Sequence, residues 1–236
     1  MSRLPTRGLI GEQIMSLFEK FTKKKPGDAP AIETTSLHET NIDITPKGAT
    51  AEDESEGYYF QNPIELAIYG KFHGKDKTVY WLTGNDYIEA YNKGFHLFEQ
   101  GRFQEALTAY RASLKLNPIG LSARFEICEV FIKMQNYADA RKTLLEMRTY
   151  LIEEENIARF YRRLGFIATE EGNYDCALAA YAYSLNFKNH PSVKNEMDYI
   201  QHVSRMGGFK ASSIVKNAAS ILTKNGLPVL TETKLN

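Results

Sequence analysis

Residues that could catalyse a reaction or bind a metal are scattered through this 236-residue sequence and match no catalytic pattern. The histidines show no HExxH motif or other metal-ligand spacing, and no GxSxG motif marks a serine nucleophile. Carboxylate runs such as Glu153–Glu155 are expected in loops or at helix ends, where water solvates them. We therefore expect no catalytic residues, no metal and no cofactor, and we predict that the protein is not an enzyme.

The segment from Gly70 to Asp76 superficially resembles a phosphate-binding loop. It has three residues between its glycines where that motif requires four, and Asp76 stands where Ser or Thr would bind magnesium. The segment is therefore not interpreted as a nucleotide site.

Charge and composition match an ordinary globular protein, with 29 Lys and Arg against 29 Asp and Glu. A net charge of zero gives no electrostatic reason to expect a nucleic acid partner. Cys128 and Cys176 lack CxxC spacing and are expected to be buried, reduced thiols. No apolar run reaches the ~18–20 residues of a membrane-spanning helix, and Glu12 and Glu19 interrupt the N-terminal apolar stretch. We expect a cytoplasmic location.

One pattern occurs three times between residues 85 and 190: a small residue, a break, an aromatic residue, an alanine and a large apolar residue. The second copy starts 34 residues after the first, and the third starts 37 residues after the second. The additional residues fall in the acidic stretch 153–156, which is predicted to be a loop. The copies are Gly94, Gly101, Phe103, Ala106 and Tyr110; Cys128, Gln135, Tyr137, Ala140 and Leu144; and Gly165, Gly172, Tyr174, Ala177 and Tyr181.

Each element of this pattern has a physical role in a helical hairpin. Apolar residues at helical spacing predict a helix on either side of the break. Gly or Asn at the break tolerates the left-handed conformation that ends the first helix. The small residue and the alanine allow the two helices to pack closely. The pattern predicts three hairpins, at about residues 87–118, 121–152 and 158–191.

The pattern resembles the tetratricopeptide repeat (TPR) family over about 45% of the chain, most clearly in residues 90–118. The usual Trp of the family is replaced by Ala90, Arg124 and Tyr161, and its closing proline is clear only at Pro118. The resemblance implies an all-α fold: a short right-handed α-solenoid of three TPR hairpins with capping helices and a disordered N-terminal region.

The flanking segments have separate predicted roles. Residues 57–84 are expected to cover the first hairpin, with a helix that starts at Asn62-Pro63. Residues 191–206 are predicted to form a capping helix, and residues 207–236 a further helix over Ser212–Thr223 followed by a tail. Residues 26–56 are interpreted as a disordered acidic linker.

Residues 1–25 form a basic amphipathic segment for which three alternatives remain open. The first alternative is a helix that lies on an anionic membrane through residues 8–25. The second is a docking helix for a protein, and the third is a marginal helix in a tail. A related hypothesis is that the acidic linker occupies the groove described next.

The family resemblance implies that the first helix of each hairpin lines a concave groove that binds peptides. This groove would be aromatic at its N-terminal end and basic at its C-terminal end, which suits a peptide with an apolar anchor and an acidic group. Two alternatives remain open: residues 57–84 cover part of the aromatic set, or the arginines form a solvated face. The predicted groove residues are Ile88, Tyr91, Phe95 and Phe98 from the first repeat; Phe125, Glu129, Ile132 and Lys133 from the second; and Arg159, Arg162, Arg163, Phe166 and Glu170 from the third.

Chaperone-binding members of the family hold a C-terminal carboxylate with a clamp of Lys and Asn residues. Here Tyr91, Phe95 and Glu126 occupy three clamp positions, and only Arg159 and Arg163 match basic ones. The resemblance therefore argues against binding of a chaperone tail, because Glu126 would repel a carboxylate.

The sequence thus predicts a non-enzymatic protein–protein interaction scaffold, or adaptor, that binds a protein segment in the TPR groove. The alternative is a TPR adaptor or chaperone tethered to a membrane surface by its N-terminal amphipathic helix.

Overall fold

The protein is described by a computed structural model over residues 56–73, 79–82 and 85–231, all of which belong to one compact unit spanning residues 43–236. The predictions for the basic segment and for nearly all of the acidic linker concern residues 1–55 and lie outside the described residues.

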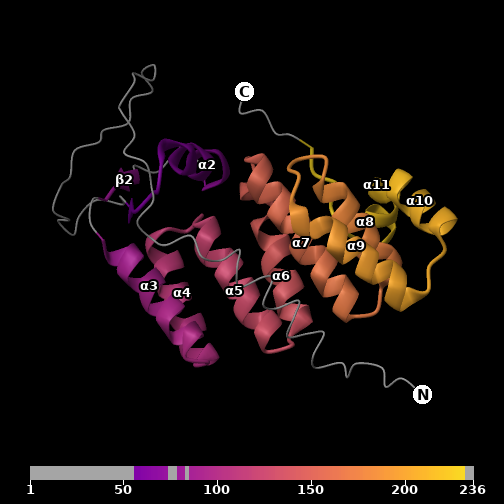
Figure 1. Ribbon diagram of the computed structural model, residues 1–236. Coiled ribbons are helices and arrows are strands. Elements are labelled where there is room, and N and C mark those ends of the chain that lie inside the picture. Colours follow the sequence, from indigo (N-terminus) through magenta and orange to yellow (C-terminus); the bar gives the residue numbers. More distant parts are fainter. Residues whose placement is uncertain (1–55, 74–78, 83–84, 232–236) are drawn as a thin grey trace. The chain divides into compact units, whose positions relative to one another are not determined.

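Three consecutive helical hairpins form the body of this unit. Each helix packs against the next one along the chain, and Figure 1 shows this succession as the colours pass from magenta to orange. The all-α, solenoid-type architecture predicted from the sequence is thereby confirmed. The hairpins consist of α3 (Asp86–Glu99) and α4 (Phe103–Leu116), α5 (Leu121–Lys133) and α6 (Tyr137–Met147), and α7 (Glu154–Glu170) and α8 (Tyr174–Ser184).

The same left-handed turn closes all three hairpins. In each turn one residue has a positive φ, and the N–H of the residue after it donates to the carbonyl five positions earlier, which ends the first helix in a Schellman motif. The positive-φ residues are Gly101 (73°), Gln135 (57°) and Gly172 (75°). The corresponding bonds are Arg102 to Leu97 (2.9 Å), Asn136 to Phe131 (2.8 Å) and Asn173 to Ala168 (2.8 Å).

The second turn differs from the sequence expectation in one respect. Asn136 is the residue type that tolerates a left-handed conformation, yet Gln135 adopts it. Asn136 instead caps α6, because its side chain accepts a hydrogen bond from the N–H of Asp139 at 3.2 Å. The turn needs a residue with positive φ and α6 needs an N-cap. The asparagine serves as the cap, and Gln135 takes the positive φ.

Within the hairpins, a glycine of the first helix faces a tyrosine ring of the second. A Cβ atom on Gly94 would lie 2.7 Å from the ring of Tyr110, and one on Gly165 would lie 2.8 Å from the ring of Tyr181. Cys128 takes this place in the second hairpin, where the residue matching the tyrosines is the smaller Leu144. Ala106, Ala140 and Ala177 are 0% exposed, as expected for alanines that allow close helix packing.

The acidic stretch before the third hairpin is not a loop, contrary to the sequence prediction. A short 3-10 turn, η1 (Arg148–Tyr150), follows α6, and α7 then begins at Glu154, with Glu154 and Glu155 in its first turn. Carboxylates are favourable there, because the N-terminus of a helix carries a partial positive charge. The additional residues therefore lengthen α7 at its N-terminus.

The segment before the first hairpin contains a small parallel sheet and one helix. Strand β1 (Glu56–Tyr58) pairs with β2 (Val79–Trp81), and α2 (Pro63–His73) lies between them in the sequence. As predicted, Asn62 caps α2, accepting a hydrogen bond from the N–H of Glu65 at 2.9 Å.

Glu65 connects α2 to the turn after α4. Its carboxylate accepts hydrogen bonds from the N–H of Gln61 at 2.7 Å and from the side chain of Asn117 at 2.8 Å. An apolar cluster lies beside these bonds. It contains Phe60, Ile68, Tyr69 and Ile119, with Tyr58, Leu66, Tyr150 and Ile152 packed against it. The segment therefore contacts both the first hairpin and the end of the second.

The C-terminal helices cover the third hairpin. Helix α9 (Pro191–Ser204) packs on α8 and buries Val193, Glu196 and Ile200. The sequence predicts one helix over 212–223, but the structure has two, α10 (Gly208–Lys216) and α11 (Ala218–Lys224), and both contact α8.

The chain after α11 returns to the third hairpin as an extended segment, residues 227–231, here called the C-terminal strap. The hydroxyl of Tyr161 donates to the carbonyl of Pro228 at 2.9 Å and accepts from the N–H of Leu230 at 2.7 Å. The hydroxyl of Tyr183 donates to the carbonyl of Leu230 at 2.9 Å. Two tyrosines thus bind the strap through its main chain.

The close approach at Gly94 and Gly165 gives a stability prediction. Gly94→Ala and Gly165→Ala should each lower the free energy of unfolding by about 1–2 kcal/mol, because the added methyl group displaces a buried tyrosine ring. Gly70→Ala in α2 is the control. Nothing lies within 4 Å of its Cβ position, so the higher helix propensity of alanine should stabilise the protein by up to about 1 kcal/mol. Chemical denaturation measures all three, and equal effects at the three sites would contradict the packing argument.

Buried Glu196 gives a pH prediction. Burial, together with the charge of Glu170, raises the pKa of Glu196 to about 7, while Tyr181 opposes this shift. Because the folded state holds this proton more tightly than the unfolded state, the contribution of Glu196 to stability is lost as pH rises from its unfolded pKa through about 7. The free energy of unfolding of Glu196→Gln, relative to the wild type, should therefore rise by about 2–3 kcal/mol between about pH 5 and pH 8. Denaturation at several pH values measures this difference, and a constant difference would refute it.

Candidate functional site

The first helices of the three hairpins, α3, α5 and α7, carry the residues predicted to line the groove. Glu126 and Glu129 of α5 lie opposite arginines of α7, and Glu126 also lies near Tyr91 of α3. The structure therefore brings together residues from all three repeats around α5.

Arg159 makes two contacts with α5. Its guanidinium lies over the ring of Phe125, 4.2 Å from the ring centroid, and its Nη2 atom is 3.3 Å from Oε1 of Glu126. A cation–π contact and an ion pair thus fix one arginine. The Arg159 side chain remains 27% exposed, so part of it still faces solvent.

Arg163 and Glu129 form a buried ion pair. Nη2 of Arg163 lies 2.6 Å from Oε2 of Glu129, and the two side chains are 7% and 6% exposed. Removing either partner would leave a charge in a site that water hardly reaches, which is strongly unfavourable. This pair therefore fixes the position of α7 against α5 and leaves neither charge available to a ligand.

Arg162 pairs within its own helix and not with α5. It donates to Glu155 on its own helix at 2.9 Å, and its charge acts on His190, the residue that caps α9. Each of the three arginines therefore has a glutamate partner. The sequence predicts a basic C-terminal end for the groove, but the structure offsets this charge with Glu126, Glu129 and Glu155.

Exposure varies strongly among the predicted groove residues. On α3, Ile88 is exposed, and Tyr91, Phe95 and Phe98 are half-buried, with Phe98 packed against Phe103 of α4. Lys133 is half-buried and Glu170 is exposed, while Phe125, Ile132 and Phe166 are buried in the packing between repeats. The accessible aromatic surface is therefore concentrated on α3.

Burial also affects the ionisable groups at the centre of the site. It raises the pKa of the Glu126 carboxyl, an effect that Arg159 opposes and Glu129 strengthens. Burial likewise raises the pKa of the Tyr91 hydroxyl, and the charge of Glu126 acts in the same direction. Tyr91 therefore stays neutral and is available as a hydrogen-bond donor near Glu126.

A cavity of about 230 Å³ opens where α2 meets the N-terminal ends of α5 and α7. Sequence reasoning missed this feature because α2 and η1 contribute to it from outside the repeat pattern. It adjoins the predicted groove through Phe125 and Arg159. Its apolar lining includes Ile64, Ile68, Tyr150 and Ile152, and its polar lining includes Glu153 and Asn156.

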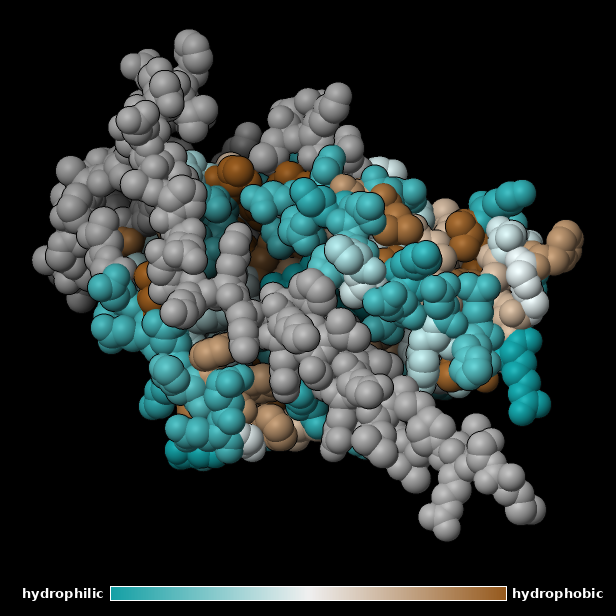
Figure 2. All heavy atoms as spheres, in the orientation of Figure 1, coloured by the Kyte–Doolittle hydropathy of each residue, from teal (hydrophilic) through white to brown (hydrophobic). Residues whose placement is uncertain are grey.

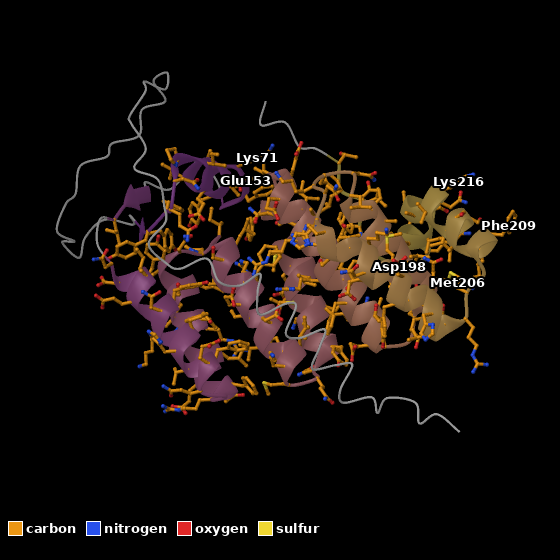
Figure 3. The ribbon with its side chains drawn as sticks, viewed as in Figure 1. Lys71, Glu153, Asp198, Met206, Phe209 and Lys216 are labelled. Atoms are coloured by element: carbon orange, nitrogen blue, oxygen red, sulfur yellow. The ribbon has the colours of Figure 1, made fainter. Side chains whose placement is uncertain are left out.

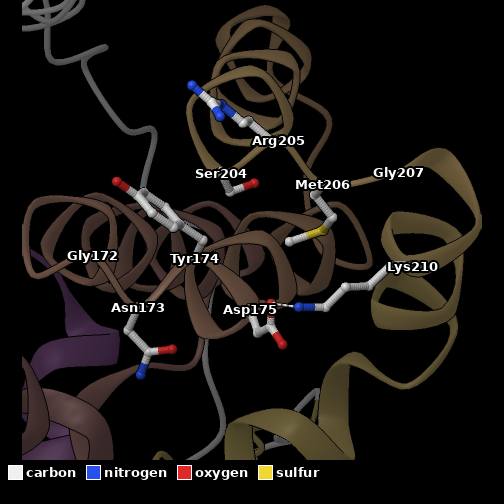
Figure 4. A pocket seen from close by; sticks show the side chains of 9 residues that line it. All are labelled: Gly172, Asn173, Tyr174, Asp175, Ser204, Arg205, Met206, Gly207 and Lys210. Carbon is white, nitrogen blue, oxygen red and sulfur yellow. Dashed lines mark ion pairs between the residues drawn. The ribbon is translucent and has the colours of Figure 1, made fainter.

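A second, shallower pocket of about 440 Å³ lies between the start of α8 and the loop from α9 to α10. Figure 4 shows Lys210 extended toward Asp175, and these side chains form an ion pair at 2.8 Å. The lining is mostly polar, and no residue predicted to bind a ligand contributes to it.

The described residues contain no group of three or more His, Cys, Asp or Glu side chains placed to hold a metal ion. Within the same ranges, every helix is too short or too polar to cross a membrane.

Comparisons with known proteins bear on the repeats. The family model described as tetratricopeptide repeat matches residues 97–150, from the end of α3 to η1. A curated relative, the Hsp70-Hsp90 organising protein of Plasmodium falciparum (isolate 3D7), is 29% identical over 117 residues, which is 46% of this chain and 20% of that protein. The chain thus spans about a fifth of the length of this relative.

Two solved structures are similar at low identity. The first TPR of Spaghetti (RPAP3), bound to the HSP90 peptide SRMEEVD, is 17% identical with a TM-score of 0.46, covering 52% of this chain and 97% of that chain. MamA (41-end) from Desulfovibrio magneticus RS-1 is 17% identical with a TM-score of 0.45, covering 70% and 88%.

The family match covers the turn of the first hairpin and all of the second, and the third repeats the same turn and the same glycine–tyrosine contact. These observations show that residues 97–150 contain a tetratricopeptide repeat and that all three hairpins share its turn geometry.

Proposed function

We propose that this protein is a non-enzymatic scaffold that binds a segment of another protein along α3, α5 and α7. The observation that carries the proposal is the half-buried aromatic set on α3, Tyr91, Phe95 and Phe98, which lies beside the charge-balanced face of α5 and α7. Aromatic side chains that are partly exposed in the free protein are typical centres of binding energy in protein interfaces.

The ligand of this groove is inferred to be anchored by apolar groups. Arg163 is buried with Glu129, and Arg159 already contacts Glu126 and Phe125, so a carboxylate would have to compete with groups of the protein itself. The cavity beside Phe125 has apolar residues next to polar ones in its lining, and its volume of about 230 Å³ has room for the apolar part of one large side chain. An acidic group on the ligand is secondary in this proposal.

The relative named for Hsp70 and Hsp90 suggests a chaperone tail as an alternative ligand. The positions of the carboxylate clamp do not favour it here, since they hold Tyr91, Phe95 and Glu126, and both matching arginines are paired with glutamates. We therefore propose a ligand other than an acidic chaperone tail. The membrane-tethered alternative depends on residues 8–25, which lie outside the described residues, and it stays a prediction, as does the cytoplasmic location.

The proposal is tested by selecting peptides from a random display library on the full-length chain. Enriched peptides should carry aromatic or aliphatic anchors, and Phe95→Ala should weaken their binding about tenfold or more, because the substitution removes half-buried aromatic surface from α3. Met134→Ala is the control, since Met134 is an exposed apolar residue at the second turn. Fluorescence anisotropy measures the affinities, and equal binding to the wild type and to Phe95→Ala would refute the groove as the site.

The charge balance of the groove gives a separate prediction. Glu126→Gln keeps the size of the side chain but removes the negative charge beside Arg159. The affinity for an aromatic peptide with a free C-terminal carboxylate should then rise about tenfold, because Arg159 gains a charge-assisted bond to the ligand. The same peptide with a C-terminal amide is the control and should gain much less. If Glu126→Gln leaves the ratio of the affinities for the two peptides unchanged, Glu126 does not regulate the access of acids to Arg159.

A further inference from the structure

Phe209 is the most exposed large apolar side chain among the described residues. It is 92% exposed, whereas the others in this class are 36–46% exposed. Figure 3 shows its ring pointing away from the molecule at the end formed by α10, and Figure 2 shows a hydrophobic spot at that end of a largely hydrophilic face.

The packing of α10 does not require Phe209. This helix buries Ala211 and Ile214 and contacts α8 through that side, while Ser212, Ser213 and Lys216 are exposed like Phe209. Residues three and four apart share a helix face, so Phe209, Ser212, Ser213 and Lys216 form one solvent-facing side. Gly207 and Gly208 precede the ring and have no side chains to shield it.

The segment that carries Phe209 is positively charged although the whole chain is neutral. Residues 199–231 contain Arg205, Lys210, Lys216 and Lys224 and not one Asp or Glu. Lys210 pairs with Asp175 of α8 at 2.8 Å. Within the part of the chain that the structure describes, Arg205, Lys216 and Lys224 form no ion pair, and of these three Lys216 lies on the same side of α10 as Phe209.

We propose that this end of the molecule contacts an anionic lipid surface, with Phe209 entering the interface, Lys216 facing lipid headgroups and the net positive charge of residues 199–231 strengthening the attraction. Aromatic rings are stable at the boundary between headgroups and hydrocarbon, and each Lys or Arg near an anionic surface strengthens binding about fivefold. The proposal concerns a surface separate from the groove and does not depend on the ligand of α3.

The geometry favours a lipid surface over a folded acidic partner. A protruding ring requires either a matching hole in a partner or a surface that deforms around it, and a lipid interface needs no matching shape. The cations also do not converge on one point. Figure 4 shows Arg205 pointing away from Lys210, while Lys216 and Lys224 lie in the last turns of α10 and α11. Positive charge that is spread over the segment carrying one exposed apolar ring matches a membrane surface.

Flotation of the purified full-length chain with lipid vesicles tests the proposal. The wild type should float with vesicles of phosphatidylcholine and phosphatidylserine and stay unbound with phosphatidylcholine alone. Phe209→Ser should lower binding to the anionic vesicles about tenfold, since a ring inserted into the interface is lost. Lys216→Glu should lower binding by more than the removal of one positive charge would, because the new carboxylate also repels the anionic lipid.

Two matched variants serve as controls. Phe72→Ser removes the next most exposed phenylalanine, which is 46% exposed on α2, and Lys115→Glu reverses an exposed charge on α4. Both should float like the wild type. All chains retain residues 1–25, so any contribution from that segment is the same in each.

A second measurement keeps a large ring in place. Phe209→Trp should show a blue-shifted emission, relative to the same chain without lipid, only with anionic vesicles, and the wild type, whose single tryptophan is Trp81, gives the background emission to subtract. Three results would each overturn the proposal: a wild type that does not float with anionic vesicles, equal flotation of wild type and Phe209→Ser, or a Trp emission that does not respond to anionic vesicles. Capture of an acidic protein through Phe209 without flotation would assign the surface to a protein partner instead.

Discussion

The close approach of two helices within each hairpin is the constraint on which the rest of the array depends. Gly94 and Gly165 leave room for the rings of Tyr110 and Tyr181, and the left-handed turn returns the second helix to the same place in every repeat. The second hairpin satisfies the same requirement with a different pair. Cys128 is larger than the glycine of the other hairpins, and Leu144 is smaller than their tyrosine. Total volume, and not residue identity, determines such packing.

The contacts between repeats have a different character, because ion pairs lie among the apolar contacts. Glu126 and Glu129 meet Arg159 and Arg163, and Arg141 of α6 pairs with Glu171 at the end of α7. Buried ion pairs contribute little net stability compared with apolar packing, but they penalise any arrangement in which the partners separate. We infer that these pairs determine how one repeat is placed against the next. The same pairing removes from the groove the basic character that its arginines would otherwise give it.

The sequence predicted the features that depend on neighbours close in the chain. The hairpins, their turns and the start of α2 at Asn62-Pro63 follow from helix periodicity, capping and the small residue opposite an aromatic one. The start of α7 was predicted wrongly, because Glu153–Glu155 have the composition of a loop and equally that of a first helical turn. The ion pairs of α7, the cavity beside α2 and the division between α10 and α11 depend on which side chains meet across helices. A single sequence contains no information on those distances.

The C-terminal strap has a consequence for the order of folding. Most of the array is made of contacts between residues close in sequence, and such topologies fold quickly, hairpin by hairpin. The bonds from Tyr161 to Pro228 and Leu230 instead join residues 67 and 69 positions apart. During synthesis, Tyr161 leaves the ribosome well before its partners are made, so the third hairpin can form while its tyrosine hydroxyls are still bound to water. The strap then completes the domain in a late, long-range step, after the local steps are finished.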